Sequence, residues 1–189
     1  MFSGVFMPNL EISSRALSVL DYSRNLFNLY GFQQVGVDRI ISETNIAKAT
    51  FYRYFQSKEK LIELCLIFQK DTLKEKIRRI RACCHHSNVL DQLRKIYLLH
   101  VDLNGPYHLL FKAIFELEKL YPKAYRIAVG YRKWLIRQIR SLLLKMKNTV
   151  TVEDATIFLF IVDGSVLELL RMNWAERQDS LLDYFLRMI

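Results

Sequence analysis

The sequence predicts an all-α protein, and two observations lead to that fold class. The 189 residues include only 6 Gly and 3 Pro, too few turn residues for a sandwich or barrel of many short strands. Apolar residues also recur at three- and four-residue steps along most of the chain, which is the spacing of one helix face. A chain of this length can form one domain, or a small domain followed by a larger one.

The first predicted helix spans about residues 16–30, and Gly31 follows where a C-terminal cap belongs. A short apolar-periodic piece predicts a second helix over about 37–44. Asn45 then suits a tight turn, because Asn tolerates the left-handed backbone conformation. A third short helix is expected over about 47–55.

A longer helix is expected to begin at the Ser57 cap and to end near Arg81. Five more helices are expected, over about residues 89–103, 106–120, 123–147, 152–172 and 176–188. The change from short to long helices near Ser57 predicts a domain boundary. We therefore expect a small three-helix domain over residues 1–56 and a larger helical domain over residues 57–189.

The third predicted helix divides its side chains by chemistry. At about 100° per residue, Phe51 and Phe55 lie on the side suited to the core. The opposite side is small, cationic and aromatic, and it carries Lys48, Ala49, Thr50, Tyr52 and Arg53. Two short helices joined by a tight turn, the second with such a face, predict a helix-turn-helix whose second helix enters the DNA major groove. On this geometry alone, an ordinary solvated face is an equal alternative.

Each polar side chain of this face suits a different part of DNA. The hydroxyls of Thr50 and Tyr52 and the ammonium of Lys58 suit phosphate oxygens. Lys48 and Arg53 are expected to approach base edges, and Ala49 lets a surface come close. The helix N-terminus at Ser57, beside Lys58, also favours a phosphate.

The stretches "LF…YGF" from Leu26, "VDRII" from Val37 and "NIAKATFYRYFQSKEKL" from Asn45 carry a family resemblance. They resemble the DNA-binding region of the TetR family of transcriptional regulators, whose typical run reads G-V-S-K-G-T-L-Y-H-H-F-x-S-K-E-x-L. The positions in step with that run are Lys48, Thr50, Tyr52, Phe55, Ser57, Lys58, Glu59 and Leu61. The chain has Asn45, Ala47 and Arg53-Tyr54 where the family usually has Gly, Ser and two His. Ala47 has no cap oxygen, which weakens helix initiation by about 1 kcal/mol.

The resemblance implies a homodimer that binds double-stranded DNA at a near-palindromic operator, most often as a repressor. It also implies that residues 57–189 form a ligand-binding and dimerisation domain for a small-molecule effector. Binding of the effector would displace the helix from Ser57 to Arg81 and weaken DNA binding. No cofactor is implied.

Two helices of the larger domain are candidates for the dimer interface. The segment Ala155–Val162 is apolar all around a helix, so it must be buried on more than one side. The last predicted helix also carries apolar residues at helical spacing, and two such helices from each chain would form a four-helix interface, with core packing as the alternative. The predicted interface residues are Phe158, Val162, Val166, Leu170, Leu182 and Phe185.

Aromatic residues of the larger domain are candidates for an effector pocket, because pockets are mainly apolar with a few polar groups. Plain core packing is the alternative. The candidates are Tyr107, Phe111, Phe115, Tyr131, Trp134, Phe158 and Asp163. Asp163 lies in an otherwise apolar helix, where an unpaired carboxylate is costly, so we expect an internal protein partner for it.

The formal net charge of +9 fits an anionic partner, although the charge is unevenly spread. Up to Lys60 there are seven basic and five acidic residues, whereas residues 112–147 carry ten and two. The basic helix predicted over 123–147 therefore offers an alternative function, a helical interaction or membrane-surface module. Its regularly spaced apolar positions favour a core helix with a cationic face.

Several classes of site are not expected. The sequence has no HExxH, P-loop or Gly-rich dinucleotide motif, so we expect no enzyme. The run Cys83-Cys84-His85-His86 is too contiguous to surround a metal ion, and no metal is expected. Three cysteines without a paired framework predict a reducing, cytoplasmic setting. The N-terminus lacks the basic start of a signal peptide, and Ala155–Val162 is too short to cross a bilayer, so no membrane partner is expected.

Overall fold

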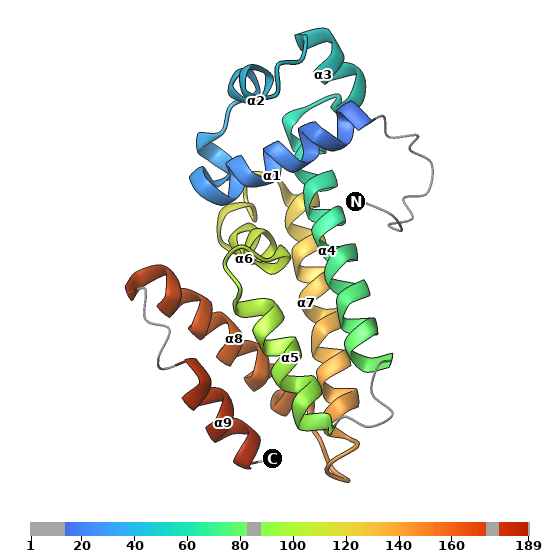
Figure 1. Cartoon of the computed structure of the whole chain (residues 1–189), viewed down its shortest axis with the longest axis vertical. Coiled ribbons are helices and arrows are strands. Elements are labelled where there is room, and N and C mark those ends of the chain that lie inside the picture. Colours follow the sequence, from blue (N-terminus) through green and yellow to red (C-terminus); the bar gives the residue numbers. More distant parts are fainter. Residues whose placement is uncertain (1–13, 83–87, 173–177, 189) are drawn as a thin grey trace. The chain divides into compact units, whose positions relative to one another are not determined.

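All regular structure is helical in the residues that the computed structural model describes, which are 14–82, 88–172 and 178–188 (Figure 1). The helices are α1 (Ser14–Gln34), α2 (Val37–Thr44), α3 (Lys48–Phe55), α4 (Lys58–Ala82), α5 (Val89–Val101), α6 (Pro106–Glu116), α7 (Pro122–Leu143), α8 (Val152–Met172) and α9 (Gln178–Met188). The predicted all-α class is confirmed.

Three helix ends differ from expectation. α1 continues past the expected cap at Gly31, where its backbone breaks, and resumes as far as Gln34. α6 ends at Glu116 because residues 117–121 turn toward Pro122, which can begin a helix but not continue one. α7 ends at Leu143, after which the hydrogen bonding tightens, and the Lys145 N–H donates to the carbonyl of Leu142, three residues earlier.

Contacts divide the chain into two compact units. Unit 1 comprises residues 1–72 and 109–129, and unit 2 comprises residues 73–108 and 130–189. The boundary predicted after residue 56 stays a prediction, and the first half of α4 shares the core of the short helices. Leu61, Ile62 and Leu66 are fully buried there, and the Cys65 thiol donates to the carbonyl of Leu20 at 3.7 Å.

The core of unit 1 is built from aromatic and branched side chains of the short helices. Phe27 and Phe32 of α1 pack with their ring centroids 5.2 Å apart, and neither side chain is exposed. Phe51 and Phe55 of α3 pack at 5.4 Å, and Ile40 of α2 is fully buried. This core fixes α2 and α3 against α1.

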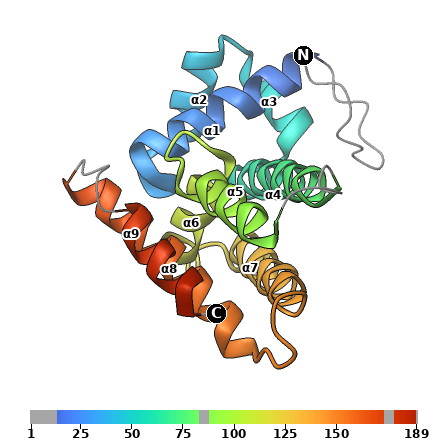
Figure 2. The same ribbon diagram turned by 60° about the horizontal axis from the view of Figure 1, so that its bottom comes forward.

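In unit 2, α5 packs against α8, and α8 lies beside α9 (Figure 2). The Tyr97 hydroxyl of α5 donates to Ser165 Oγ of α8 at 2.8 Å. Arg81, near the end of α4, donates to Gln138 Oε1 and Ser141 Oγ of α7. Polar contacts therefore supplement the apolar core between these helices.

Candidate nucleic-acid interface

The turn between α2 and α3 has the conformation that its sequence predicts. Asn45 is in the left-handed region, with φ 49 and ψ 44. Its N–H donates to the carbonyl of Ser42 at 3.3 Å, and the Ile46 N–H donates to the carbonyl of Ile41 at 3.3 Å. Ile46 is buried, so the turn is anchored to the core. The predicted role of Asn45 is confirmed.

α3 separates a buried side from an exposed side as its sequence predicts. Phe51 and Phe55 are buried, whereas Lys48, Ala49, Tyr52 and Arg53 are exposed, and Thr50 is half-buried between them. The N-cap residue, Ala47, is extended and provides no side-chain hydrogen bond to the helix. The exposed side of α3 is therefore available to a partner.

The cations of α3 have weak partners within the chain. Lys48 Nζ lies 3.3 Å from Asp38 Oδ1 of α2, and both side chains are largely exposed, so this ion pair contributes little to stability. The Arg53 guanidinium lies over the ring of Tyr54, 5.1 Å from its centroid. Both cations can exchange these contacts for DNA at small cost.

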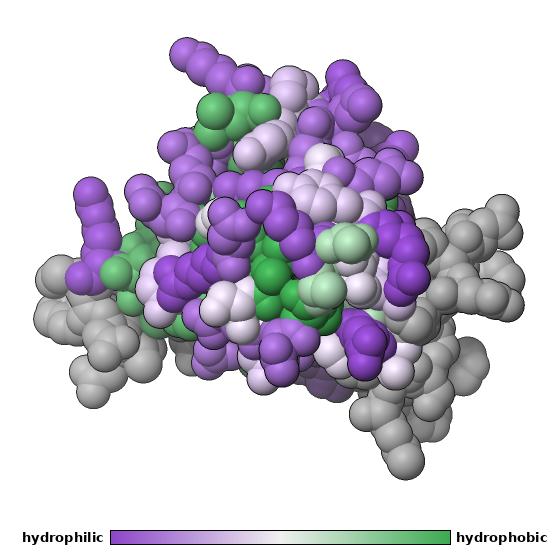
Figure 3. All heavy atoms as spheres, turned by 90° about the horizontal axis from the view of Figure 1, so that it is seen from above, coloured by the Kyte–Doolittle hydropathy of each residue, from purple (hydrophilic) through white to green (hydrophobic). Residues whose placement is uncertain are grey.

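The start of α4, which follows α3 in the chain, adds the polar residues Ser57 and Lys58. Ser57 caps the helix, since its Oγ accepts from the Lys60 N–H at 3.1 Å. Lys58 Nζ lies 3.5 Å from the carbonyl of Gln33, and partial burial lowers the pKa of this ammonium. The face drawn in Figure 3 is mainly hydrophilic, with apolar side chains at its centre and toward its upper left.

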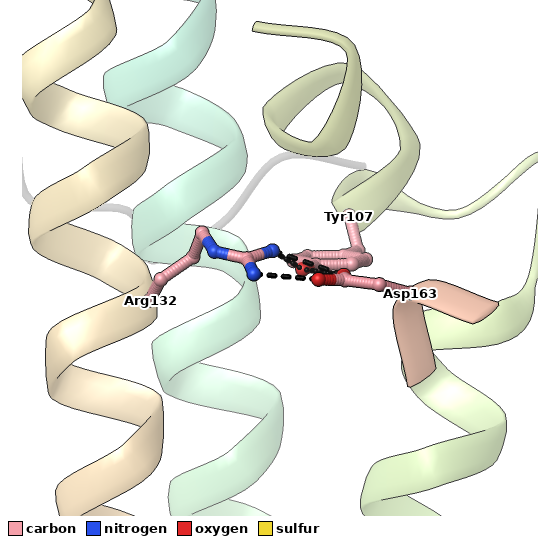
Figure 4. Close-up of polar contacts among 3 residues, drawn as sticks. All are labelled: Tyr107, Arg132 and Asp163. Atoms are coloured by element: carbon pink, nitrogen blue, oxygen red, sulfur yellow. Dashed lines mark hydrogen bonds and ion pairs between the residues drawn. The ribbon is translucent and has the colours of Figure 1, made fainter. Parts of the chain in front are cut away.

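In unit 2, Asp163 has the internal partner that its sequence context predicts (Figure 4). Arg132 donates from Nη1 to Asp163 Oδ1 at 2.9 Å and from Nη2 to Oδ2 at 2.5 Å. The Tyr107 hydroxyl donates to Asp163 Oδ1 at 2.9 Å and accepts from Arg132 at 2.8 Å. Burial, with the nearby Asp163 carboxylate, raises the pKa of Tyr107 well above its usual value, so it remains a donor.

A buried histidine adjoins this cluster. His100 Nδ1 lies 2.6 Å from the carbonyl of Ile96, and Nε2 lies 2.7 Å from the Tyr131 hydroxyl. The first contact requires a proton on Nδ1, so Nε2 accepts from Tyr131. Burial lowers the pKa of His100 to about 4, which keeps the ring neutral. Its ring centroid lies 4.7 Å from that of Tyr107.

The structure thus brings Tyr107, Tyr131 and Asp163 of the predicted effector site together, but with internal partners. Sequence reasoning missed Arg132 and His100. A signal for Arg132 was present, because it falls on the apolar stripe of α7 that includes Ala128 and Leu135, and a cation there requires a buried counter-charge.

The other predicted pocket residues lie in different settings. In unit 2, Phe158 is buried, and Trp134 is half-buried with Lys74 Nζ 5.2 Å from its ring centroid. In unit 1, Phe111 is buried, whereas Phe115 is 65% exposed. The role of these residues in effector binding stays a prediction.

Most of the predicted interface residues are already buried within the single chain. They are Phe158, Val162, Val166, Leu182 and Phe185. Only Leu170 of that set is exposed, at 47%. A segment that is apolar all around a helix has two apolar sides, and the five buried residues occupy the side that packs within the chain. The other side of α8, with α9, leaves Ile157, Phe160, Leu167, Leu170 and Tyr184 exposed.

The run from Cys83 to His86 lies outside the described residues. Within the described ranges, no three His, Cys, Asp or Glu side chains gather as metal ligands. The helices described for this chain also include none with the length and apolar character needed to cross a membrane.

Residues 19–65 match the model of the family "Bacterial regulatory proteins, tetR family". Among curated proteins, no sequence matches the chain. Solved structures with the same fold include a TetR-family transcriptional regulator from Agrobacterium tumefaciens, with 19% identity, a TM-score of 0.83 and coverage of 93% of this chain and 97% of that one. A TetR regulator from Legionella pneumophila has 16% identity, a TM-score of 0.82 and coverage of 95% and 100%. The reduced form of NemR from E. coli has 17% identity, a TM-score of 0.79 and coverage of 92% and 95%.

These likenesses establish a shared fold over nearly the whole chain, and the family match covers the helix-turn-helix whose geometry is described above. Residues 19–65 therefore match the tetR family of bacterial regulatory proteins, and the chain shares the fold of solved TetR-family transcriptional regulators.

Proposed function

We propose that this protein is a DNA-binding transcriptional regulator of the TetR family, acting as a homodimeric repressor of a near-palindromic operator, and that a small-molecule effector releases it. The observation that carries the DNA-binding part is the division of α3. Phe51 and Phe55 anchor the helix, while Lys48, Tyr52 and Arg53 are exposed together directly after the left-handed turn. A helix presented in this way fits the major groove.

Each exposed residue has a proposed role. Lys48 and Arg53 approach base edges, because both carry donors that suit guanine acceptors. Thr50, Tyr52 and Lys58 hold phosphates, and Ala49 allows close approach. The contact of Lys48 with Asp38 supports this assignment, since an exposed ion pair keeps the ammonium near the α2–α3 surface without burying it.

We place the dimer interface on α8 and α9. One helix-turn-helix makes few contacts, so tight binding requires two copies on two half-sites. Ile157, Phe160, Gly164 and Leu167 follow one another at helical spacing on the exposed side of α8. A side chain added at Gly164 would meet nothing within 4 Å, so this position leaves room for a partner helix. Leu170 and Tyr184 extend the apolar surface.

The effector step rests on the family. We expect the larger domain to bind the effector near the aromatic residues of unit 2, and we expect action in the cytoplasm without catalysis or a cofactor. The membrane-surface alternative is weakened by the burial of Tyr131, Leu135 and Ile139 on α7, which leaves that helix with few apolar side chains to insert into lipid.

The proposal is tested by capturing random genomic fragments with the purified protein at physiological salt and sequencing what is retained. A Lys48→Ala/Tyr52→Ala double variant is run in parallel. We expect the wild-type protein to enrich a palindromic motif that the variant does not enrich. No enrichment over the variant would contradict the assignment of α3 as the reading helix.

A further inference from the structure

Two contacts at the end of α1 share one origin, the break of that helix at Gly31. In an unbroken helix, the Phe32 N–H would donate to the carbonyl of Asn28, four residues earlier. At the break, Gly31 has φ 79 and ψ 166, and the Phe32 N–H donates to Glu116 Oε2 at 2.8 Å instead. The Asn28 carbonyl accepts from Lys112 Nζ at 2.5 Å. The Phe32 N–H and the Asn28 carbonyl, which would bond to each other in an unbroken helix, therefore each have a side-chain partner.

Both partners come from the same turn of α6. Lys112 and Glu116 are four residues apart, so their side chains extend from one face of the helix. The ammonium supplies the donor and the carboxylate supplies the acceptor that the broken bond requires. All four residues belong to unit 1, in which α6 contacts α1 through these two hydrogen bonds.

Gly31 makes this arrangement possible for two reasons. Its φ of 79 is a conformation that residues with a side chain rarely adopt. A Cβ atom at this position would also lie 3.0 Å from Glu116 Oε2 and 3.2 Å from Oε1. A larger residue would therefore strain the backbone and push the carboxylate away from the Phe32 N–H.

The break also sets the direction of the segment that leads into the helix-turn-helix. Phe32 and Val35 follow it directly, and both are fully buried in the core of unit 1. Lys58 Nζ contacts the carbonyl of Gln33 within this segment, and α2 begins at Val37. A change at Gly31 would therefore be transmitted to the placement of α2 and α3.

We propose that Lys112 and Glu116 are positioning residues for the DNA-reading helices, because their two contacts hold the break in α1 from which α2 and α3 take their direction. This inference rests on the proposed function, since it assigns a role in DNA binding.

The test uses the full-length protein and an operator fragment enriched by the wild-type protein. Glu116→Ala removes the acceptor, Lys112→Met removes the donor but keeps most of the side-chain volume, and Glu116→Gln keeps an acceptor oxygen. We expect Glu116→Ala and Lys112→Met each to weaken operator affinity by about tenfold, the usual effect of losing a charge-assisted hydrogen bond. Glu116→Gln should stay close to wild type. The double variant Lys112→Met/Glu116→Ala should lose less than the product of the single losses, because both side chains serve one broken bond.

Matched controls come from the next residues of the chain. Glu118→Ala and Lys119→Ala remove the same charges at exposed positions outside the contact and should leave affinity unchanged. The backbone is followed separately, without DNA, by the NMR chemical shift of the Gly31 Cα. In Glu116→Ala this shift should differ from that of the wild-type protein, while thermal unfolding confirms that the variant is folded.

An unchanged Gly31 shift, or operator affinity equal to or tighter than wild type in Glu116→Ala, would overturn the proposal. Failure of the wild-type protein to bind any enriched fragment would contradict the proposed function instead. In that case the Gly31 shift still decides whether α6 controls the break in α1.

Discussion

The burial of His100 predicts a specific loss of stability in mild acid. The ring is fully buried, and burial lowers its pKa to about 4, against about 6.5 in the unfolded chain. In that interval the unfolded chain binds a proton that the folded protein does not. The stabilisation is therefore fully present above about pH 6.5 and is lost as the pH falls toward 4.

The magnitude follows from the pKa difference. Each unit of difference corresponds to about 1.4 kcal/mol, so the complete loss is about 3 kcal/mol. Most of this loss falls between pH 7 and pH 5. With pKa values of about 4 in the folded protein and about 6.5 in the unfolded chain, the free energy of unfolding falls by about 2 kcal/mol in that range. No correction for solvent screening is needed, since the side chain has no exposed surface.

Urea unfolding of the wild-type protein and a His100→Gln variant at several pH values provides the assay. Carboxylates also titrate in this range, so the informative quantity is the difference between the two proteins. We expect the free energy of unfolding to fall more steeply with acid in the wild-type protein, by about 2 kcal/mol between pH 7 and 5. Parallel pH profiles would refute the reasoning, as would an NMR titration in which the His100 ring gains its proton near pH 6.5.

Three further predictions concern the reading face, the interface and the buried ion pair. Lys58→Ala should weaken binding to all DNA sequences and reduce the salt slope by about 1, whereas Arg53→Ala should also relax base preference; equal losses on every sequence for both variants would contradict the assigned roles. Phe160→Asp should raise the dimer dissociation constant by about 100-fold or more in sedimentation equilibrium, while Leu98→Asp, which alters an exposed apolar residue of α5, should not. Asp163→Ala leaves a largely buried guanidinium without its carboxylate and should lower the free energy of unfolding by about 3 kcal/mol in urea titrations, and a change below about 0.5 kcal/mol would show the pair to be unimportant.

Helical periodicity was sufficient to predict the arrangement of α3. Phe51 and Phe55 are buried and Tyr52 is exposed, as their angular positions require. The turn was equally accessible, because Asn is one of the few residues that adopt the left-handed conformation seen at Asn45. These features depend on neighbours within about ten residues, where the sequence carries direct information.

Features that depend on residues far away in the sequence could not be predicted in the same way. The sequence indicated that Asp163 needs a partner, but Arg132 was one of many basic residues in its region. For α8, apolar residues on two sides do not reveal which side faces the same chain. Phe160 and Phe158 are therefore equivalent in sequence but not in the structure, where the first is 63% exposed and the second is buried.

The sharing of unit 1 between two separate stretches of chain has a consequence for protein engineering. A chimeric regulator would join a reading domain from one protein to a sensing domain from another. Here, a chimera cut after Thr72 would lack some of the packing partners of its reading domain, because Leu109–Val129 belongs to the same unit. A sensing domain from elsewhere would have to provide a donor for Asn28 and an acceptor for Phe32 at equivalent places. Grafts that include residues 109–129 should therefore keep DNA recognition more often than grafts cut after α4.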